Sequence, residues 1–440
     1  METAGARPSL RERWRDRLTA GVTEGTALYP LAVLFGLNAV DELDRTAFNV
    51  LTPEIRRDFD LDLSGVLAIL SAVEATAILL GIPLAYLADR RRRVRMAAGG
   101  AALWGSFSVL TAAATSTGML AGARAGAGLG RAVTTPTHFS LLADFYPAEV
   151  RPKVYGAHRA ANSVGQIAGP LLAGTLAFFF GWRAPFVLFA VPTAVLVVAA
   201  LRLAEPERGA HERRAAGLAQ EAAVIEDPAP PFIEACRLLW RIRTLRRIWF
   251  ALPLAAVLIV GLGAVFSTFY EEEFGLNSAQ RGLASALTEP AQLIGLFVGV
   301  PVANRLLKRD PALVLRFIAV VGLVVAGAFA LLSVTPNLAV VIGLNMLISG
   351  SAAVFQPGAF AVVSLTMPPK VRSLGFALSA LWILPGLALF PLLGALADES
   401  GIRPAFAALA PVLAVAGLLF ASAGRYVRAD MAAARAVLPS

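Results

Sequence analysis

The chain alternates between long apolar stretches and short polar ones along almost its whole length. Twelve apolar segments are long enough to cross a lipid bilayer, which takes about 20 residues of α-helix. They lie at approximately 28–51, 62–88, 94–113, 117–143, 156–180, 185–203, 248–270, 282–304, 311–333, 337–364, 373–398 and 404–424. The pattern predicts an all-α membrane protein with twelve transmembrane helices.

Three short motifs of the first half recur in the second half at nearly equal offsets. G-I-P-L-A at 81–85 returns as G-V-P-V-A 218 residues later, P-x-x-F at 136–139 returns after 221 residues, and G-x-R-x-x-F at 181–186 returns after 220. Matching order and spacing indicate a duplicated unit. We therefore predict two pseudo-symmetric six-helix bundles. The expected divisions are a basic segment at 1–27 without a signal-peptide pattern, bundles at 28–203 and 248–424, a linker with an amphipathic basic helix at 204–247, and a tail at 425–440.

Basic residues are distributed unevenly between the predicted loops. If the N-terminus is cytoplasmic, the inner segments hold 28 Lys and Arg residues and the outer loops hold five. This asymmetry predicts that both termini are cytoplasmic, in the cell (inner) membrane. The net charge of +9 is thus explained by topology and lipid, and we expect no nucleic-acid partner. One cysteine and three histidines without ligand spacing predict no metal site, and no cofactor is expected.

The first predicted span carries charges that a lipid-facing helix would not tolerate. At about 100° per residue its polar residues form one stripe, with Asp44 at the edge. The stripe consists of Asn38, Asp41, Glu42, Arg45 and Asn49. A charge at mid-bilayer costs roughly 2.5–3.5 kcal/mol on insertion scales, which makes this face a functional hypothesis. The structural alternative is an ion pair from Asp41 to Arg45, one turn apart, that only stabilises the helix packing.

The fourth predicted span carries a matching cationic stripe. Arg124, Arg131 and His138 repeat every seven residues and therefore project from one face. At 1.5 Å per residue, Arg124 lies at the depth of Asp44 and Arg45, whereas Arg131 lies deeper, near Asp41 and Glu74. We expect the fourth span to face the first across a cavity, with acids and bases in two layers. For His138 alone, a structural role is an equal alternative.

Three motifs resemble signatures of the major facilitator superfamily, whose fold is the twelve-helix arrangement predicted above. They are A-Y-L-A-D-R-R-R-R-V-R at 85–95, R-x-x-x-G-x-G-x-A at 124–132, and G-x8-G-x3-G-P-x2-A-G at 156–174. The first suggests a gating latch of Asp89, Arg90 and Arg93, against which plain positive-inside topology stands as the alternative. The third suggests a hinge and a close seam at Gly165, Gly169 and Pro170, against ordinary small-residue packing.

The region around Asp44, with L-T-P-E-I-R-R-D-F at 51–59, resembles the spinster-like branch of that superfamily. Members of the branch export lysophospholipids and related single-chain lipids, some with proton coupling. Asp41 stands where the branch usually has asparagine, and Arg131 where it usually has glutamate. The resemblance implies proton coupling, and the acids that this sequence places in its first two spans, Asp41, Asp44 and Glu74, are the candidates for it.

The second half has few intramembrane charges, of which Glu289 is the main one. Val265, Phe266 and Phe269 are candidate lining for an apolar side of the cavity, and Glu271–Glu273 is expected to be a solvated outer cap. Ordinary packing is an equal alternative for the three apolar residues. An ionic and an apolar side would together suit an amphiphile.

These patterns predict a secondary transporter that works by alternating access and is not an enzyme. It would be a proton-coupled monomer that moves an amphiphilic anion such as a lysophospholipid. Its substrate site would consist of Arg45, Asn49, Arg124, Arg131, His138 and Glu289. The main alternative is a proton-coupled multidrug efflux antiporter, and a non-transporting sensor is a further one.

Overall fold

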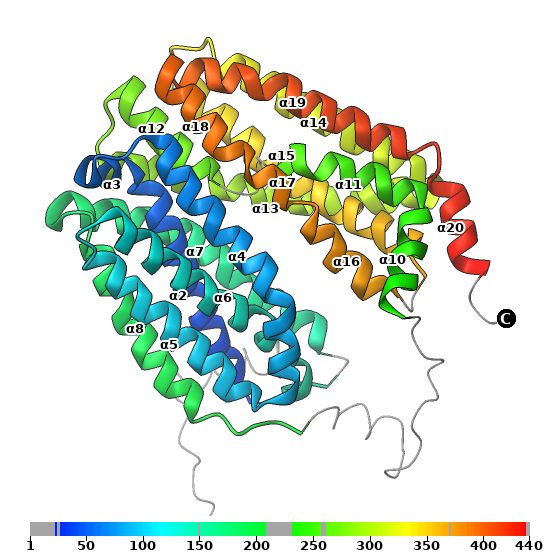
Figure 1. Ribbon diagram of the computed structural model, residues 1–440, viewed down its shortest axis with the longest axis horizontal. Coiled ribbons are helices and arrows are strands. Elements are labelled where there is room, and N and C mark those ends of the chain that lie inside the picture. The colour runs from blue at the N-terminus through cyan, green and yellow to red at the C-terminus, as the bar shows by residue number, and fades with distance from the viewer. Residues whose placement is uncertain are drawn as a thin grey trace, which may run out of the picture.

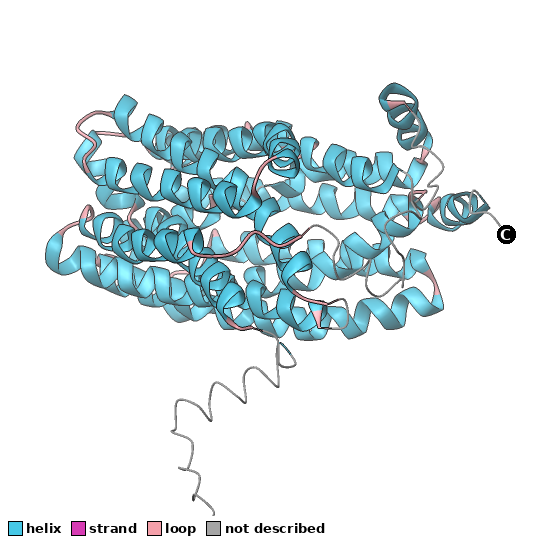
Figure 2. Cartoon of the chain, turned by 90° about the horizontal axis from the view of Figure 1, so that it is seen from below, coloured by secondary structure: helices cyan, strands magenta, loops and turns pink. Residues whose placement is uncertain are grey.

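The computed structural model describes residues 23, 27–147, 150–207, 231–256, 261–368 and 371–436, and every regular element in this part of the chain is a helix (Figure 2). The predicted N-terminal segment and most of the predicted linker lie outside the described residues. The helices are α2 Tyr29–Val50, α3 Thr52–Phe59, α4 Leu63–Arg90, α5 Arg93–Ala112, α6 Thr117–Phe145, α7 Arg151–Phe180, α8 Ala184–Leu201, α10 Phe232–Arg241, α11 Arg243–Ala255, α12 Leu262–Phe274, α13 Ser278–Arg309, α14 Pro311–Leu332, α15 Leu338–Thr366, α16 Arg372–Leu381, α17 Leu384–Leu387, α18 Leu389–Ser400, α19 Ile402–Ala423 and α20 Val427–Ala436.

The helices form two bundles, α2–α8 and α11–α19, that lie side by side (Figure 1). Corresponding turns of the two bundles have the same backbone shape. Gly181 has φ 82° and ψ 163°, and Gly401 has φ 90° and ψ 163°, a region open to glycine. The arginine two residues later donates to a backbone carbonyl in each bundle, from Arg183 to Ala114 at 3.0 Å and from Arg403 to Thr335 at 2.8 Å. These equivalences support the duplication.

The two bundles meet through equivalent helix pairs, α7 with α13 and α4 with α18. Glycines allow close backbone approach in both pairs. A Cβ atom on Gly282 would overlap the carbonyl oxygen of Pro170, and one on Gly394 would lie 2.5 Å from the Cα atom of Ser64. Ion pairs add to this contact at the end where α3 and α12 lie, which we call the closed end (Figure 1).

Gly174 lies in the seam between α7 and α13, where an added Cβ would overlap the carbonyl oxygen of Ser278 at the start of α13. We expect Gly174→Val to separate the two helices, because backbone cannot move aside as a flexible side chain can. Spin-label distances across the closed end should lengthen. Gly118→Val is the control, since a Cβ on Gly118 meets no atom within 4 Å. Unchanged distances in Gly174→Val would show that the seam is not needed to hold this end shut.

Eight helices in the described part of the chain are long and apolar enough to cross a membrane. The helix α2 falls outside this set because it carries Asp41, Glu42, Asp44 and Arg45. Two predicted spans are divided in the structure. The seventh consists of α11 and α12, with 257–260 not described, and the eleventh consists of α16, α17 and α18.

The predicted amphipathic helix before the seventh span is shorter than expected. It ends at Arg241, and the following arginines belong to α11, which begins at Arg243 rather than at 248. The reason is a cap from the tail, where Asp430 of α20 accepts a hydrogen bond from the backbone N–H of Thr244 at 2.7 Å.

A second contact also fixes α20. The pKa of Asp310, between α13 and α14, is lowered to about 2 because Arg428 donates hydrogen bonds to its carboxylate. A lowered pKa means that this contact is fully present above the ordinary value of 3.8 and is lost only as the pH falls through about 2. The docking of α20 is therefore insensitive to pH in the neutral range.

Candidate functional site

A cavity of about 540 Å³ lies in the N-terminal bundle, between α2, α4, α5, α6 and α7. Its charged lining consists of three carboxylates and three guanidinium groups, and two histidines complete its titratable wall. These residues are Asp41, Glu42, Glu74, Arg45, Arg131, Arg159, His138 and His158. With neutral histidines the formal charge of the wall is balanced.

The polar faces of α2 and α6 meet in an ionic network behind this wall. Arg131 donates from Nε to Oδ1 of Asp41 at 2.6 Å and from Nη2 to Oδ2 of Asp44 at 2.9 Å. Arg124 donates from Nη1 to the same Asp44 oxygen at 3.0 Å, and Ser108 of α5 donates to the other one. The two layers expected from the sequence are therefore present, and Arg131 bridges them.

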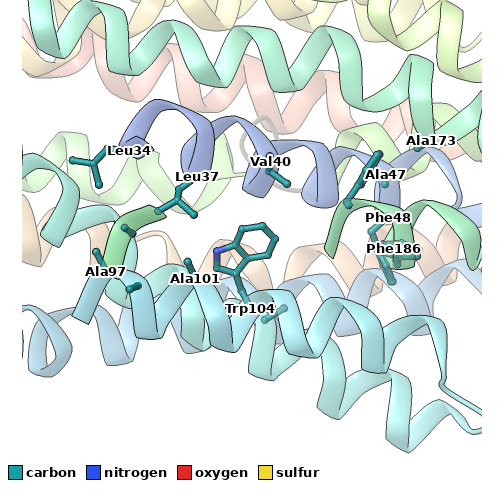
Figure 3. Close-up of a cluster of buried hydrophobic side chains, with 14 of the residues drawn as sticks. Leu34, Leu37, Val40, Ala47, Phe48, Ala97, Ala101, Trp104, Ala173 and Phe186 are labelled. Carbon is teal, nitrogen blue, oxygen red and sulfur yellow. The ribbon is translucent and has the colours of Figure 1, made fainter. Parts of the chain in front are cut away.

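Arg124 is part of the bundle core, with a side chain only 2% exposed. Its guanidinium carbon lies 4.6 Å from the centre of the Phe48 ring and 5.8 Å from that of Phe186. The apolar residues of α2 around this point pack against Trp104 of α5 and Phe186 of α8 (Figure 3). Because Arg124 does not line the cavity, it cannot contact a ligand there, and it acts on the cavity only through Asp44.

The structural alternative of an Asp41–Arg45 pair is wrong, because Arg45 instead pairs with Glu42 on the same helix. Its Nε atom donates to Glu42 Oε1 at 3.0 Å, and Gln166 of α7 donates to the same oxygen at 3.1 Å. Glu289 of the other bundle lies close enough to Glu42 and Arg45 to interact electrostatically with both. The arginine side chain is 37% exposed, and it is the most accessible cation of the network.

His138 does not stand alone, since its Nδ1 lies 3.2 Å from Nε2 of His158 on α7. Both residues are only 3% exposed, and both line the cavity. Asn38 holds α7 at this point by donating to the backbone carbonyl of His158 at 3.1 Å and to the side chain of Asn162 at 2.9 Å. Sequence spacing could not reveal this pair, because it joins two different helices.

Two predicted groups of lining residues lie elsewhere. Asn49 is at the boundary between the bundles, where its side chain contacts Gly263 of α12, and it does not line the cavity. The interpretation of Val265, Phe266 and Phe269 as lining is wrong, since all three are buried in the core of the C-terminal bundle among residues such as Phe406. These side chains pack against other aromatic rings inside the bundle and therefore do not reach the cavity.

The acids expected to form a solvated cap at 271–273 instead take part in the closed end. Glu271 pairs with Arg57 and Arg281, and Glu272 pairs with Arg56 at 2.9 Å. Arg281 is almost fully buried and also pairs with Glu54 of α3, so it joins the two bundles. The sequence places Arg281 among outer-loop cations. Its burial depends on the meeting of two distant segments, which no local pattern signals.

The predicted latch is only partly visible. The side chains of Asp89 and Arg90 lie outside the described residues, and their role stays a prediction. Arg93 is buried and pairs within its own bundle, with Asp144 and, at 3.4 Å, with Glu205. Glu205 also accepts the backbone N–H groups of Arg93 and Val94, both at 2.9 Å, and so caps α5.

The predicted hinge residues lie on one continuous helix, α7, with Pro170 inside it. Added Cβ atoms on Gly165 and Gly169 would overlap Glu42 and Thr46 of α2. These glycines thus allow α7 to approach the acidic helix, which is the close seam expected from the motif. Bending at Pro170 stays a prediction.

Comparison with known proteins identifies the family to which this architecture belongs. Residues 34–350 match the family model of the Major Facilitator Superfamily. The chain belongs to this superfamily. Its fold resembles the inward-facing, unoccupied structure of a bacterial homologue of the human lysosomal transporter Spinster, with a TM-score of 0.79, 20% identity, and coverage of 91% of this chain and 98% of that one. The predicted twelve-helix fold is thereby confirmed, and the family is one of transporters rather than enzymes.

Curated proteins that resemble this chain include a transporter and an efflux pump. A probable actinorhodin transporter of Streptomyces coelicolor is 32% identical over 40% of this chain, but the match covers only 31% of that protein. An MFS-type efflux pump of Mycolicibacterium smegmatis is 24% identical over 77% of each chain.

Proposed function

We propose that this protein is a proton-coupled secondary transporter that works by alternating access and moves an amphiphilic anion such as a lysophospholipid. The protein would act as a monomer in the cell inner membrane, with both termini cytoplasmic. The observation that carries the proposal is the one-sided cavity, whose ionic wall belongs entirely to the N-terminal bundle. An amphiphile needs charged groups for its head and apolar surface for its chain, and the same cavity is also lined by apolar side chains such as Leu37, Val73 and Ile78.

Arg131 is the residue best placed to exchange a hydrogen bond with the protein for one with the substrate. It lines the cavity, and its two hydrogen-bonded carboxylates are held unequally. Asp44 also has Arg124 and Ser108, whereas Arg131 is the one side chain seen to hydrogen bond to Asp41 in the described structure. Protonation of Asp41 would release the Nε side of Arg131 for a phosphate oxygen while Nη2 stays on Asp44. Binding of an anion and protonation of Asp41 would then favour each other, and Glu74 on the same wall could pass the proton on.

The proposal can be tested by thermal stabilisation of the purified protein with a panel of lysolipids, drugs and sugars. We expect lysophospholipids to stabilise it. Arg131→Lys should lower their affinity about ten- to a hundredfold, because lysine keeps the charge but loses the planar fork, and one charge-assisted contact contributes roughly 1.5–3 kcal/mol. Arg159→Lys is the control, since Arg159 also lines the cavity.

The competing structural role of Arg131 predicts another outcome. If Arg131 is only a counter-ion, Arg131→Ala lowers stability, Asp41→Asn restores it, and lipid affinity does not change in either variant. That combination would remove Arg131 from the substrate site.

A multidrug efflux antiporter is the second candidate, and the relatives named for actinorhodin transport and for efflux favour it. A cationic drug would use the carboxylates instead of the arginines. In this case Glu74→Gln and Glu289→Gln should weaken drug binding, and Arg131→Lys should not. Stabilisation by cationic drugs and by no lysolipid would favour this candidate.

A further inference from the structure

The His138–His158 pair has a hydrogen-bonding problem that its surroundings do not solve. Nδ1 of His138 and Nε2 of His158 face each other at 3.2 Å, so one ring donates its N–H to the other. The outer Nε2 of His138 is buried and has no hydrogen-bond partner among the described residues, and the outer Nδ1 of His158 is buried with only the backbone of Leu34 near it. A neutral imidazole has one N–H and one bare nitrogen.

Counting protons shows that one outer nitrogen of the pair is always left without a proton. Two neutral rings carry two protons, and one of them lies in the N–H···N bond between the rings. The other lies on one outer nitrogen, so the remaining outer nitrogen keeps its lone pair. This holds for either assignment of donor and acceptor, and therefore does not depend on which tautomer is chosen. The pair in the cavity wall therefore always has one buried basic nitrogen that carries no proton.

Two of the three acids of the same wall are hydrogen-bonded to fixed cations. Asp41 is bound by Arg131, and Glu42 is bound by Arg45 and Gln166. The other groups that face the cavity from the elements packed around the pair are Arg131 on α6, Arg159 on α7 and Glu74 on α4, while α5 contributes Trp104. The histidines are thus the neutral basic groups of a wall whose charges otherwise balance.

We propose that His138 and His158 together form a one-proton binding site in the cavity wall. A hydronium ion in the cavity gives its proton to the bare outer nitrogen, leaves as water, and produces an imidazolium that donates to the neutral second ring. A second proton is disfavoured, because two N–H groups would then face each other at 3.2 Å. The bound proton gives the wall one net positive charge. The inference here rests on the proposed function: the added charge selects substrates whose headgroup has a net negative charge.

The proton site can be tested without any substrate by ¹⁵N NMR of histidine-labelled protein in detergent. The chain has three histidines, and His211→Gln identifies the signals of the third. Between about pH 8 and pH 3 we expect the pair to take up one proton, with the imidazolium signal divided between the two rings. Uptake of two protons in independent steps, or no uptake over this range, would overturn the proposal. Because wild-type protein is measured, misfolding of a variant cannot decide the result.

The effect on substrate choice is tested with two lipids of fixed headgroup charge. Between pH 8 and the pH at which the NMR experiment shows the pair to be protonated, affinity for lysophosphatidylglycerol should rise relative to lysophosphatidylcholine by about tenfold, as expected for a unit charge about 10 Å away at an effective dielectric constant of about 20. His138→Gln should remove this rise. A flat profile in wild-type protein that binds both lipids would refute the selection by charge. Failure to bind either lipid would instead refute the proposed substrate and leave the NMR result standing.

Discussion

Replacing Asp44 by asparagine should destabilise the protein by about 3–5 kcal/mol, which is the usual cost of removing one member of a buried ion pair. Asp44 is fully buried, and it is the only carboxylate seen within ion-pair distance of Arg124 in the described structure. Arg124 is surrounded by phenylalanine rings and cannot reach water, so its charge would lose its partner while remaining desolvated. The apparent melting temperature in detergent measures this effect.

Two further variants show whether the loss comes from the unpaired cation. Asp44→Asn combined with Arg124→Met should be more stable than Asp44→Asn alone, because a neutral side chain of similar length would fill the place of the guanidinium. Asp60→Asn, at an exposed turn with φ 50°, is the control and should leave the melting temperature unchanged. A double variant no more stable than the single one would show that Asp44 acts through another contact.

Glu54→Gln should shift the protein towards a state in which the closed end is open. Glu54 is the N-terminal-bundle partner of the buried Arg281, which keeps Glu271, Ser267 and the carbonyl of Leu276 as partners in its own bundle. The Glu54–Arg281 contact that the variant loses is therefore made only when the two bundles meet at the closed end. A hydrogen bond between charged groups contributes roughly 1.5–3 kcal/mol, so the ratio of the two states should change about ten- to a hundredfold.

The matched control for this variant is Glu273→Gln. Glu273 pairs with Arg403 at 2.7 Å at the same end of the molecule, but both belong to the C-terminal bundle. Distances between spin labels on α3 and α13 should gain a longer population in Glu54→Gln and keep the original distribution in Glu273→Gln. The same change in both variants would mean that loss of any ion pair loosens this end and that Glu54 has no special role.

The sequence predicts the fold well because each bilayer-spanning helix is a local pattern and the duplication is visible as a repeat. It also predicts that α2 and α6 face each other, since Arg124 and Asp44 can be placed at one depth by counting residues. It does not predict which acid meets which base. Glu42 rather than Asp41 pairs with Arg45, a choice made by side-chain reach and by Gln166 from a third helix.

Contacts between distant segments account for the remaining differences. His158 lies 20 residues from His138, and Glu54 lies 227 residues from Arg281, so neither pair shares a helical period. Phe266 and Phe269 have the same apolar pattern whether they face a cavity or a core, and only the packing of Phe406 against them decides. Local patterns thus identify the helices and their polar faces, whereas the partners of each face depend on the assembled bundles.

Transport of a fluorescent lysophospholipid in proteoliposomes, with and without an imposed pH gradient, tests the central claim most directly. We expect the gradient to drive net movement in wild-type protein. In Asp41→Asn the gradient should have no effect, while exchange of labelled for unlabelled lipid continues, because the substrate site remains and only the coupling acid is lost. Gradient-driven movement that persists in Asp41→Asn, or the absence of any lipid movement in wild-type protein, would contradict the account.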